Sequence, residues 1–196
     1  KDKGIKPTPT IGGVGLIKNY ENMITMNFKN TGNVVYVLGK TEGHLDQSIF
    51  AKDILNEKKG PPPSINLFNE KNIGETILSL IEKKLIVSCH DVSLGGIITA
   101  VSKMCIKGNK GIKLNNLKGL TNKYEYFFGE DQARYIVEIS KDNIQNVIEI
   151  LNNNSVYFDD LGTIEEKNVT FNGDINLTIE ELSEVHKYWL QEYMNN

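Results

Sequence analysis

Short continuous apolar runs alternate along the chain with stretches whose apolar residues have helical spacing. The continuous runs predict buried strands at residues 33–40, 85–88 and 134–139, because a strand covered on both faces is apolar throughout. Residues 169–177 contain Asn172-Gly173, which is the strongest short signal for a β-hairpin. The pattern therefore supplies the strands of a sheet, with one hairpin among them.

Helical spacing of apolar residues recurs between these strands and after the hairpin. It predicts helices at residues 46–55, 73–81, 94–105 and 144–151, and a last helix after Thr178. Thr178 and Glu181 form a capping box, and the last helix is expected to bury Leu182, Val185 and Trp189. Strands that alternate with helices, plus a hairpin, predict an α/β domain (mixed α+β) with a mixed sheet packed by helices.

Length and composition narrow the class of protein. At 196 residues with 39% hydrophobic residues, the chain suits a single globular domain. A net charge of −3 with scattered lysines gives no basis for a nucleic-acid partner, and no apolar run approaches the ~20 residues of a membrane span. Cys89 and Cys105 form neither a metal-binding pair nor a disulfide framework. A protein of the reducing cytoplasm is expected.

The first residues form a segment that differs from the rest. The chain begins at Lys1, and "KDKGIKPTPTIGGVGLI" predicts a loop leading into a strand at residues 14–17 with no partner strand nearby in the sequence. Residues 1–20 are therefore expected to be the tail of a missing upstream domain, and residues 21–196 the domain itself. An unpaired apolar strand invites pairing with another chain, so a dimer of the chain is expected through residues 14–17.

Residues 87–96, "VSCHDVSLGG", place cysteine, histidine, aspartate and serine at the end of a predicted strand. Adjacent strand residues point to opposite faces, so Cys89 and His90 do not form the hydrogen-bonded pair that a cysteine nucleophile needs. His90 is expected to point away from its neighbours and to orient the loop by hydrogen bonding. Cys89 is expected to be a small buried residue without reactivity.

Two interpretations of Asp91 and Ser93 remain open. In one, Asp91 supplies an oxygen ligand to Mg²⁺, and the backbone amides from Ser93 to Gly96 face an anion at the start of a helix. In the other, Ser93 caps the helix and Asp91 offsets its dipole. Two further polar loops have the same ambiguity. "FFGEDQAR" at residues 127–134 is also typical of a solvated turn with a salt bridge, and Ser48 is favoured as an N-cap.

Four segments in this order resemble the C-terminal part of the phosphoribosylformylglycinamidine synthases, the ATP-dependent amidotransferases of purine synthesis. They are "PTPTIGGVGLI" (7–17), "VVYVLGKT" (34–41), "SCHDVSLGGI" (88–97) and "FFGEDQAR" (127–134). The resemblance covers nearly the whole chain. It implies a C-type synthetase domain like that of aminoimidazole ribonucleotide synthetase, preceded in residues 1–20 by the tail of an ATP-binding N-type domain.

The resemblance also implies a reaction. The intact enzyme would convert formylglycinamide ribonucleotide, ammonia from glutamine and ATP into formylglycinamidine ribonucleotide, ADP and phosphate, with Mg²⁺. Because nothing follows the last helix, a short form is expected, in which a glutaminase subunit and a small bridging subunit join the synthetase. The family's catalytic histidine and main ATP-binding residues belong to segments absent from this chain. No catalytic residue is therefore assigned, and the chain alone is expected to be inactive.

The family pattern implies roles for three groups of residues. The position of Asp91 holds Mg²⁺, and Ser93, with Gly95 and Gly96 leaving room for close approach, contacts nucleotide at an auxiliary site. By the pseudo-symmetry of the two halves of the synthetase, candidate substrate ligands are Glu130, Asp131 and Gln132.

This chain departs from the family at two places. Serine usually stands at Asp131, and two glycines usually stand at Asp46 and Gln47 before Ser48. Glycines there let backbone amides approach a phosphate, whereas an aspartate would repel it. Two alternatives therefore stay open: a non-catalytic scaffold half of the synthetase, or a C-type domain of a sister enzyme such as thiamine-phosphate kinase, selenophosphate synthetase or a hydrogenase-maturation protein.

Overall fold

The structure is a computed structural model that describes residues 9–57, 59–115 and 122–195. The strands are β1 (Val34–Leu38), β2 (Ser88–Asp91), β3 (Gly111–Leu114), β4 (Tyr135–Ile139), β5 (Phe158–Glu165), β6 (Asn168–Phe171) and β7 (Ile175–Thr178). The helices are α1 (Ile49–Asp53), α2 (Leu67–Glu82), α3 (Gly96–Gly108), α4 (Lys123–Phe128), α5 (Ile144–Asn153) and α6 (Ile179–Asn195), with short 3₁₀ helices η1 (Tyr20–Asn22) and η2 (Lys141–Asn143).

The described strands form one seven-stranded sheet in the order β2-β4-β1-β5-β3-β6-β7. Its neighbours pair antiparallel, except for β3 and β6, which pair parallel. The sheet is therefore mixed, as predicted. The interior strand β1 pairs with β4 on one side and with β5 on the other, and its register with β5 shifts between Val35 and Tyr36.

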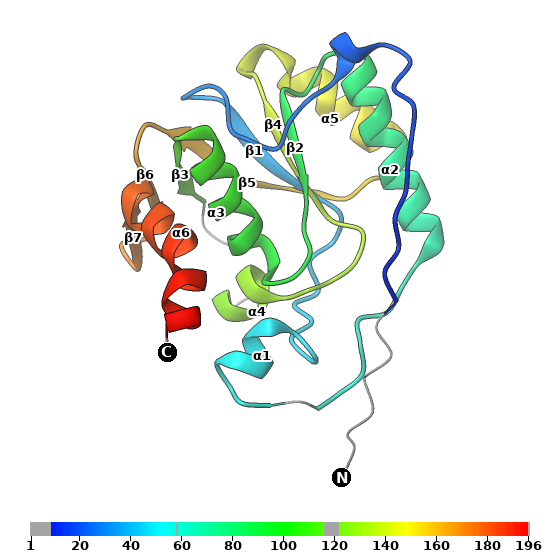
Figure 1. The fold of residues 1–196 in the computed structure, drawn as a ribbon. Helices are drawn as coiled ribbons and strands as arrows, with labels where there is room; N and C mark the ends of the chain where they lie inside the picture. The colour runs from blue at the N-terminus through cyan, green and yellow to red at the C-terminus, as the bar shows by residue number, and fades with distance from the viewer. Residues whose placement is uncertain (1–8, 58, 116–121, 196) are drawn as a thin grey trace.

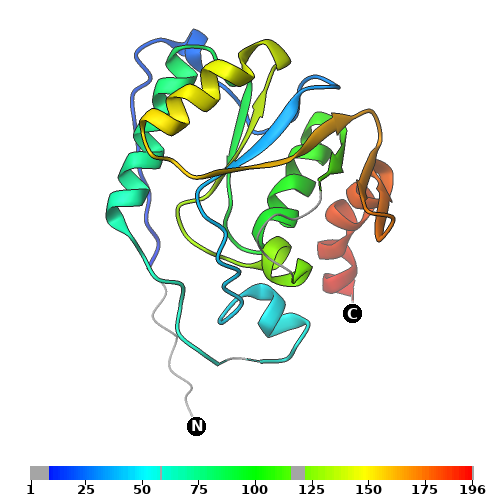
Figure 2. The same cartoon turned by 180° about the vertical axis from the view of Figure 1, so that it is seen from behind.

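Helices cover both faces of the sheet because the central strands are apolar on both faces. Val35 and Val37 of β1 belong to a core cluster under α3 and α4, whereas Tyr36 and Leu38 belong to a second cluster under α2 and α5. This assignment follows from the alternation of side chains along a strand. Figures 1 and 2, seen from opposite sides, show α3, α4 and α6 on one face and α2 and α5 on the other. The predicted fold class is confirmed.

Glu138 on β4 is a fully buried carboxylate that joins β4 to two other parts of the chain. It accepts hydrogen bonds from the backbone N–H of Lys29 (2.8 Å) and Asn30 (3.0 Å), and from the side chains of Asn33 (2.7 Å) and Ser88 (3.0 Å). A buried charge is tolerated only when its acceptor atoms are satisfied, and here four donors satisfy it. The loop before β1 and the start of β2 are thereby fixed to the sheet.

Several predicted elements are confirmed. The helices predicted around residues 49, 77, 100 and 148 are α1, α2, α3 and α5, and the hairpin at Asn172-Gly173 joins β6 to β7. The capping box is also present: Thr178 N–H donates to the Glu181 carboxylate (2.8 Å), and Glu181 N–H donates to the Thr178 hydroxyl (3.1 Å). None of the helices in the described part of the chain is long and apolar enough to cross a membrane.

Three predictions about elements need correction, and three elements were missed. Residues 14–17 form no strand, and the side chains of Val14 and Leu16 are fully exposed, since no other strand reaches them. The strand predicted at 85–88 begins only at Ser88 and continues to Asp91. On α6, Val185 and Trp189 are exposed, and Ile179 is the buried residue instead. Strands β3 and β5 and helix α4 were not predicted at all.

Candidate functional site

Three polar loops meet at one end of the sheet. Strands β1 and β2 both run antiparallel to β4, so their carboxyl ends lie beside the amino end of β4. The loop after β1 leads into α1, the loop after β2 leads into α3, and residues 129–134 lead from α4 into β4. These are the three polar loops that the sequence singles out, and the topology brings them together (Figure 1).

Glu130 holds the three loops together. Its Oε1 accepts hydrogen bonds from the N–H of Ile49 (2.9 Å), at the start of α1, and from the N–H of Gly95 (2.8 Å), just before α3. Its own N–H donates to the carbonyl of His44 (2.9 Å). Two backbone donors on one carboxylate oxygen make charge-assisted hydrogen bonds, which are stronger than neutral ones. Glu130 therefore fixes the geometry of this end of the sheet.

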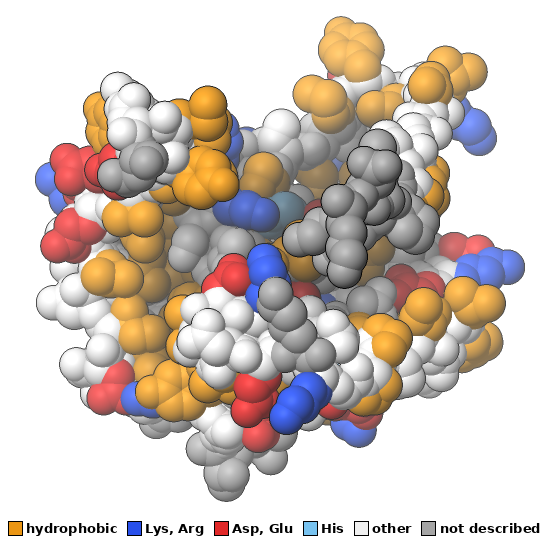
Figure 3. Space-filling view, turned by 60° about the horizontal axis from the view of Figure 1, so that its bottom comes forward, with side chains coloured by type: hydrophobic (Ala, Val, Ile, Leu, Met, Phe, Trp, Pro, Cys, Tyr) orange, Lys and Arg blue, Asp and Glu red, His pale blue; other side chains and the backbone are white. Residues whose placement is uncertain are grey.

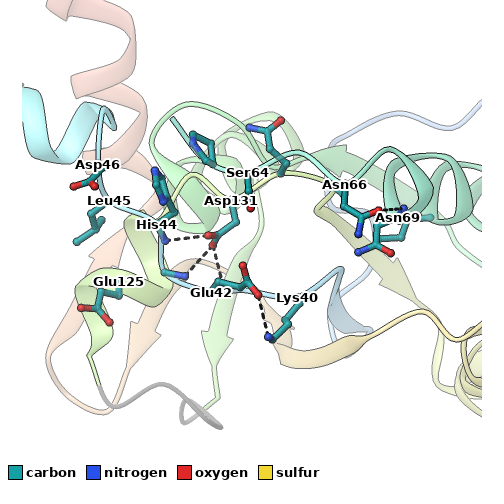
Figure 4. Close-up of a pocket in the computed structure, with 15 residues that line it drawn as sticks. Lys40, Glu42, His44, Leu45, Asp46, Ser64, Asn66, Asn69, Glu125 and Asp131 are labelled. Atoms are coloured by element: carbon teal, nitrogen blue, oxygen red, sulfur yellow. Dashed lines mark hydrogen bonds and ion pairs between the residues drawn. The ribbon is translucent and has the colours of Figure 1, made fainter. Parts of the chain in front are cut away.

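Asp131 makes an equivalent arrangement with the loop after β1. Its carboxylate accepts hydrogen bonds from three successive N–H groups, those of Glu42 (3.1 Å), Gly43 (3.0 Å) and His44 (2.9 Å), as Figure 4 shows. The side chain is buried, with 7% exposure. It also pairs with Arg134, whose Nη1 lies 3.5 Å from Asp131 Oδ2.

Arg134 is a fully buried cation at the centre of this arrangement. Its Nη2 donates to the carbonyl of Gly129 (2.6 Å), its Nε to the carbonyl of Asp131 (3.2 Å), and its Nη1 to the hydroxyl of Thr41 (3.3 Å). Burial lowers the pKa of Arg134, and the neighbouring Asp131 carboxylate opposes that shift. The residue fixes the loop before β4 rather than facing solvent.

A polar cavity of about 620 Å³ opens beside these loops. It is lined by Lys40, Glu42, Gly43, His44, Leu45, Asp46, Pro63, Ser64, Asn66, Asn69, Ile73, Glu125, Asp131, Gln132 and Ala133. Figure 3 views the end of the molecule that carries α1 and shows a hollowed surface there. Lys40 forms an ion pair with Glu42 (2.9 Å) on its wall, so its positive charge is already paired.

The predicted ligand residues do not all reach this cavity. Of them, Asp131 and Gln132 line it, whereas Asp91, Ser93 and Glu130 are not among the described residues of its wall. Asp91, the last residue of β2, and Ser93, on the loop that follows, are both exposed. Their predicted roles remain predictions.

The glycines after β2 already use their N–H groups within the chain. The N–H of Gly95 donates to Glu130, and the N–H of Gly96 donates to the carbonyl of Ser93 (3.0 Å). Gly96 is still required for close packing, because a Cβ there would lie 2.5 Å from the carbonyl oxygen of Phe127. An anion at this turn would therefore have to bind through other groups, or displace the Glu130 carboxylate.

His90 contacts Asp91 instead of pointing away from it, which corrects the prediction. The His90 Nδ1 lies 3.1 Å from Asp91 Oδ1. Burial lowers the pKa of His90, so the neutral ring is favoured, and its buried Nε2 has no hydrogen-bond partner among the described residues.

The chain's donor set for Mg²⁺ at this turn is small. No group of three or more His, Cys, Asp or Glu side chains in the described part of the chain is placed to hold a metal ion. Mg²⁺ characteristically keeps several waters and uses one or two protein carboxylates together with phosphate oxygens. The exposed Asp91 carboxylate fits that mode, as a single ligand.

Ser48 is the N-cap that the sequence favours, since its hydroxyl accepts a hydrogen bond from Ala51 N–H (3.0 Å). Gln47 has a positive φ of 59°, a conformation that glycine adopts more readily. Sequence analysis missed the contributions of Arg134 and of the N–H groups of residues 42–44. The one residue in the sequence that could have indicated this loop is Gly43. Its φ is 82°, and a Cβ at this position would have no room beside Glu125.

Comparison with known proteins places the chain among relatives of one kind. It is 62% identical over its whole length to a protein of Pelagibacter ubique named phosphoribosylformylglycinamidine synthase subunit PurL, covering 27% of that relative. A Rhodopseudomonas palustris protein of the same name is 33% identical over 192 residues, which are 98% of this chain and 26% of the relative. The chain thus spans about a quarter of the length of the curated relatives it matches.

The fold is shared with solved structures. The structure of Thermotoga maritima PurL complexed with FGAR has a TM-score of 0.67 and 20% identity, covering 83% of this chain and 30% of that one. The structure of Escherichia coli HypE has a TM-score of 0.55 and 12% identity, covering 81% of this chain and 52% of that one. A family model described as AIR synthase related protein, C-terminal domain, matches residues 30–172. Since that match takes in most of the chain, including all three polar loops, the chain belongs to the AIR synthase related family as its C-terminal domain.

Proposed function

We propose that this chain is the C-terminal synthetase domain of a phosphoribosylformylglycinamidine synthase and acts as part of that longer enzyme. The observation that carries the proposal is that the chain is 62% identical, over its whole length, to a relative of that name. The intact enzyme would join ammonia derived from glutamine to formylglycinamide ribonucleotide, with ATP cleaved to ADP and phosphate. The T. maritima PurL structures complexed with FGAR and with ATP support this choice of substrate and cofactor.

In this proposal, the polar end of the sheet faces a neighbouring ATP-binding domain. The exposed Asp91 carboxylate would hold Mg²⁺, which neutralises phosphate charge when it is bound, and the exposed Ser93 hydroxyl would contact nucleotide. Gly95 and Gly96 would allow close approach at the same turn. On the cavity side, Gln132 is the exposed member of the three candidate substrate ligands, while Glu130 and Asp131 hold the loops in place.

The proposal extends to setting and partners. A synthase of the short form would work in the cytoplasm with a glutaminase subunit and a small bridging subunit, which would deliver ammonia to it. The domain boundary at residue 20 belongs to the same proposal, with residues 1–20 as the tail of an upstream ATP-binding domain. The match of the family model to residues 30–172 is compatible with that boundary.

A second candidate is a non-catalytic scaffold half of the same synthetase. One specific observation favours it: the N–H groups of Gly95 and Gly96 are engaged inside the chain. Asp46 and Gln47, in place of two glycines, favour it as well. The intact Asp91 and Ser93 favour nucleotide binding.

A nucleotide titration of the full-length enzyme separates the two candidates. We expect Asp91→Ala to weaken Mg-nucleotide binding at this site by about 10- to 150-fold, since loss of one charge-assisted contact costs roughly 1.5–3 kcal/mol. Calorimetry gives the affinity, and formation of the amidine product by the unaltered enzyme gives the activity. Asp53→Ala, which removes an exposed carboxylate from α1, is the matched control. The isolated 196-residue chain should form no product.

Unchanged nucleotide affinity in the Asp91→Ala enzyme would favour the scaffold. Absence of amidine formation by the full-length enzyme, supplied with all substrates and ammonia, would remove the proposed function itself.

A further inference from the structure

The N–H groups of Glu42, Gly43 and His44 converge on one point, which is the carboxylate of Asp131. Their nitrogen atoms lie 3.1, 3.0 and 2.9 Å from its oxygens. Successive backbone N–H groups that point into one concavity form a nest, and nests bind anions. The positive φ of Gly43 (82°) shapes this turn, and a Cβ at that residue would lie 2.7 Å from the Cβ of Glu125. The nest is therefore built into the loop and is not an effect of side-chain placement alone.

A buried cation completes the nest. Arg134 Nη1 lies 3.5 Å from Asp131 Oδ2, and the other N–H groups of the guanidinium are held by the carbonyls of Gly129 and Asp131. The cation cannot turn away to solvent because its side chain is fully buried. Three amides and a fixed guanidinium together form the donor set that a carboxylate or a phosphate oxygen requires.

We propose that residues 42–44 and Arg134 form an oxyanion site that the chain fills with the carboxylate of its own Asp131. The Asp131 carboxylate therefore prevents a carboxylate or phosphate of a molecule in the adjoining cavity from binding at this position. Besides charged side chains such as Lys40 and Glu42, the lining of the cavity offers a ligand the neutral hydrogen-bonding side chains of Gln132, Asn66 and Asn69. The inference goes beyond the proposed ligase function and does not depend on it.

Removing the internal carboxylate should expose the oxyanion site. In Asp131→Ala, the three N–H groups lose their acceptor and the buried Arg134 loses its counter-charge, which is destabilising. A small external oxyanion restores both. Formate has the same charged group as the lost side chain, and inorganic phosphate tests whether the space admits a phosphate.

The test compares thermal unfolding of the full chain and its variants in sodium formate, sodium phosphate and sodium chloride at equal ionic strength. We expect Asp131→Ala to unfold roughly 5–10 °C below the unaltered chain in chloride, and to regain part of that loss in formate. The unaltered chain and the control Asp53→Ala should respond equally to formate and chloride. In nuclear magnetic resonance spectra, the amide signals of Glu42, Gly43 and His44 should move with formate in Asp131→Ala only.

Equal responses of Asp131→Ala to formate and chloride would overturn the proposal, as would formate-induced movement of these amide signals in the unaltered chain. Phosphate acting like formate would assign the site to both anions, and phosphate without effect would restrict it to carboxylates. If Asp131→Ala does not fold, the proposal is tested by the hydrogen exchange of the amides of Glu42, Gly43 and His44. They should be protected in the unaltered chain and less protected in Asp131→Asn, and unprotected amides in the unaltered chain would contradict the inference.

Discussion

Cys89 and Cys105 are two thiols that the fold keeps protonated. Burial raises the pKa of each to about 12, and Asp91 adds to the shift at Cys89. The thiolate is the reactive form, and at pH 8 a thiol of pKa 12 is ionised only in about one molecule in ten thousand. We expect both cysteines to react slowly with a thiol reagent in the native chain, and rapidly in urea, as followed by absorbance.

The same shifts set a pH dependence of stability. Because the pKa of each thiol is higher in the folded chain than the ordinary value of 9.0, the folded chain holds these protons more tightly. The stabilisation is therefore fully present below pH 9 and is lost as pH rises toward about 12. Cys89 is partly exposed, which corrects the expectation that it is buried, whereas Cys105 is buried. Cys89 is therefore the stricter test, and its rapid labelling in the native chain would contradict this account.

Residue roles were predictable where the partners are close in sequence. Ser48 and the Thr178–Glu181 box bond groups only three positions away, so local pattern rules find them. The carboxylate of Asp131 instead bonds N–H groups almost 90 positions away. No spacing rule connects such positions, so the sequence does not reveal that Glu130 and Asp131 hold loops together, whereas their predicted role as ligands stays a prediction.

At the scale of elements, two glycines predict effects of opposite sign. Gly173, in the turn between β6 and β7, has a φ of 77°, and nothing lies within 4 Å of the site of its absent Cβ. Gly74 lies inside α2, also with open space around it. We expect Gly173→Ala to lower the free energy of unfolding by about 1 kcal/mol through left-handed backbone strain. Gly74→Ala should raise it by roughly 0.5–1 kcal/mol through helix propensity.

Urea unfolding of the two variants beside the unaltered chain measures both changes, and each variant serves as the control for the other. Because neither position is crowded, packing does not enter the comparison. If the free energy of unfolding rose in Gly173→Ala as well as in Gly74→Ala, the turn of the hairpin would not be held in the left-handed conformation.

Elements were predictable where the apolar pattern is periodic, as in α2, α3 and α5, and not where the fold itself sets the requirement. Strand β5 contains Asp159, Asp160 and Gly162 and therefore resembles a turn in sequence, yet it lies between β1 and β3. Gly162 is needed because a Cβ would lie 2.2 Å from the carbonyl oxygen of Lys113 on β3. That close approach of two strands is a property of the assembled sheet. It produces no periodic pattern of apolar residues from which the strand could be predicted.

At the scale of the whole molecule, the segment before β1 predicts association. The segment before η1 runs alongside α2 (Figures 1 and 2), and the side chains of its residues Val14 and Leu16 are fully exposed. We expect the chain to dimerise through this segment, because pairing would bury both side chains and satisfy backbone groups. Sedimentation velocity of the chain and of a variant with Val14→Asp and Leu16→Asp measures the effect.

Val185→Asp is the matched control, since Val185 is an exposed apolar residue on α6, away from this segment. We expect the dimer to persist in the control and to disappear in the double variant. A dimer that survives removal of residues 1–17 would place the association surface elsewhere, and a dimer lost only in Val185→Asp would place it on α6.

The strand order has a consequence for the time course of synthesis. Strand β1 lies inside the sheet, between β4 and β5, and its register with β5 pairs Tyr36 with Asp160. Because a chain leaves the ribosome amino end first, the apolar residues of β1 emerge long before β5, their second neighbour in the sheet, has been made. Contacts between such distant segments form slowly, and surfaces that wait for them are prone to aggregate. The yield of native protein in a cell should therefore depend on what shields β1 until residues 158–165 emerge.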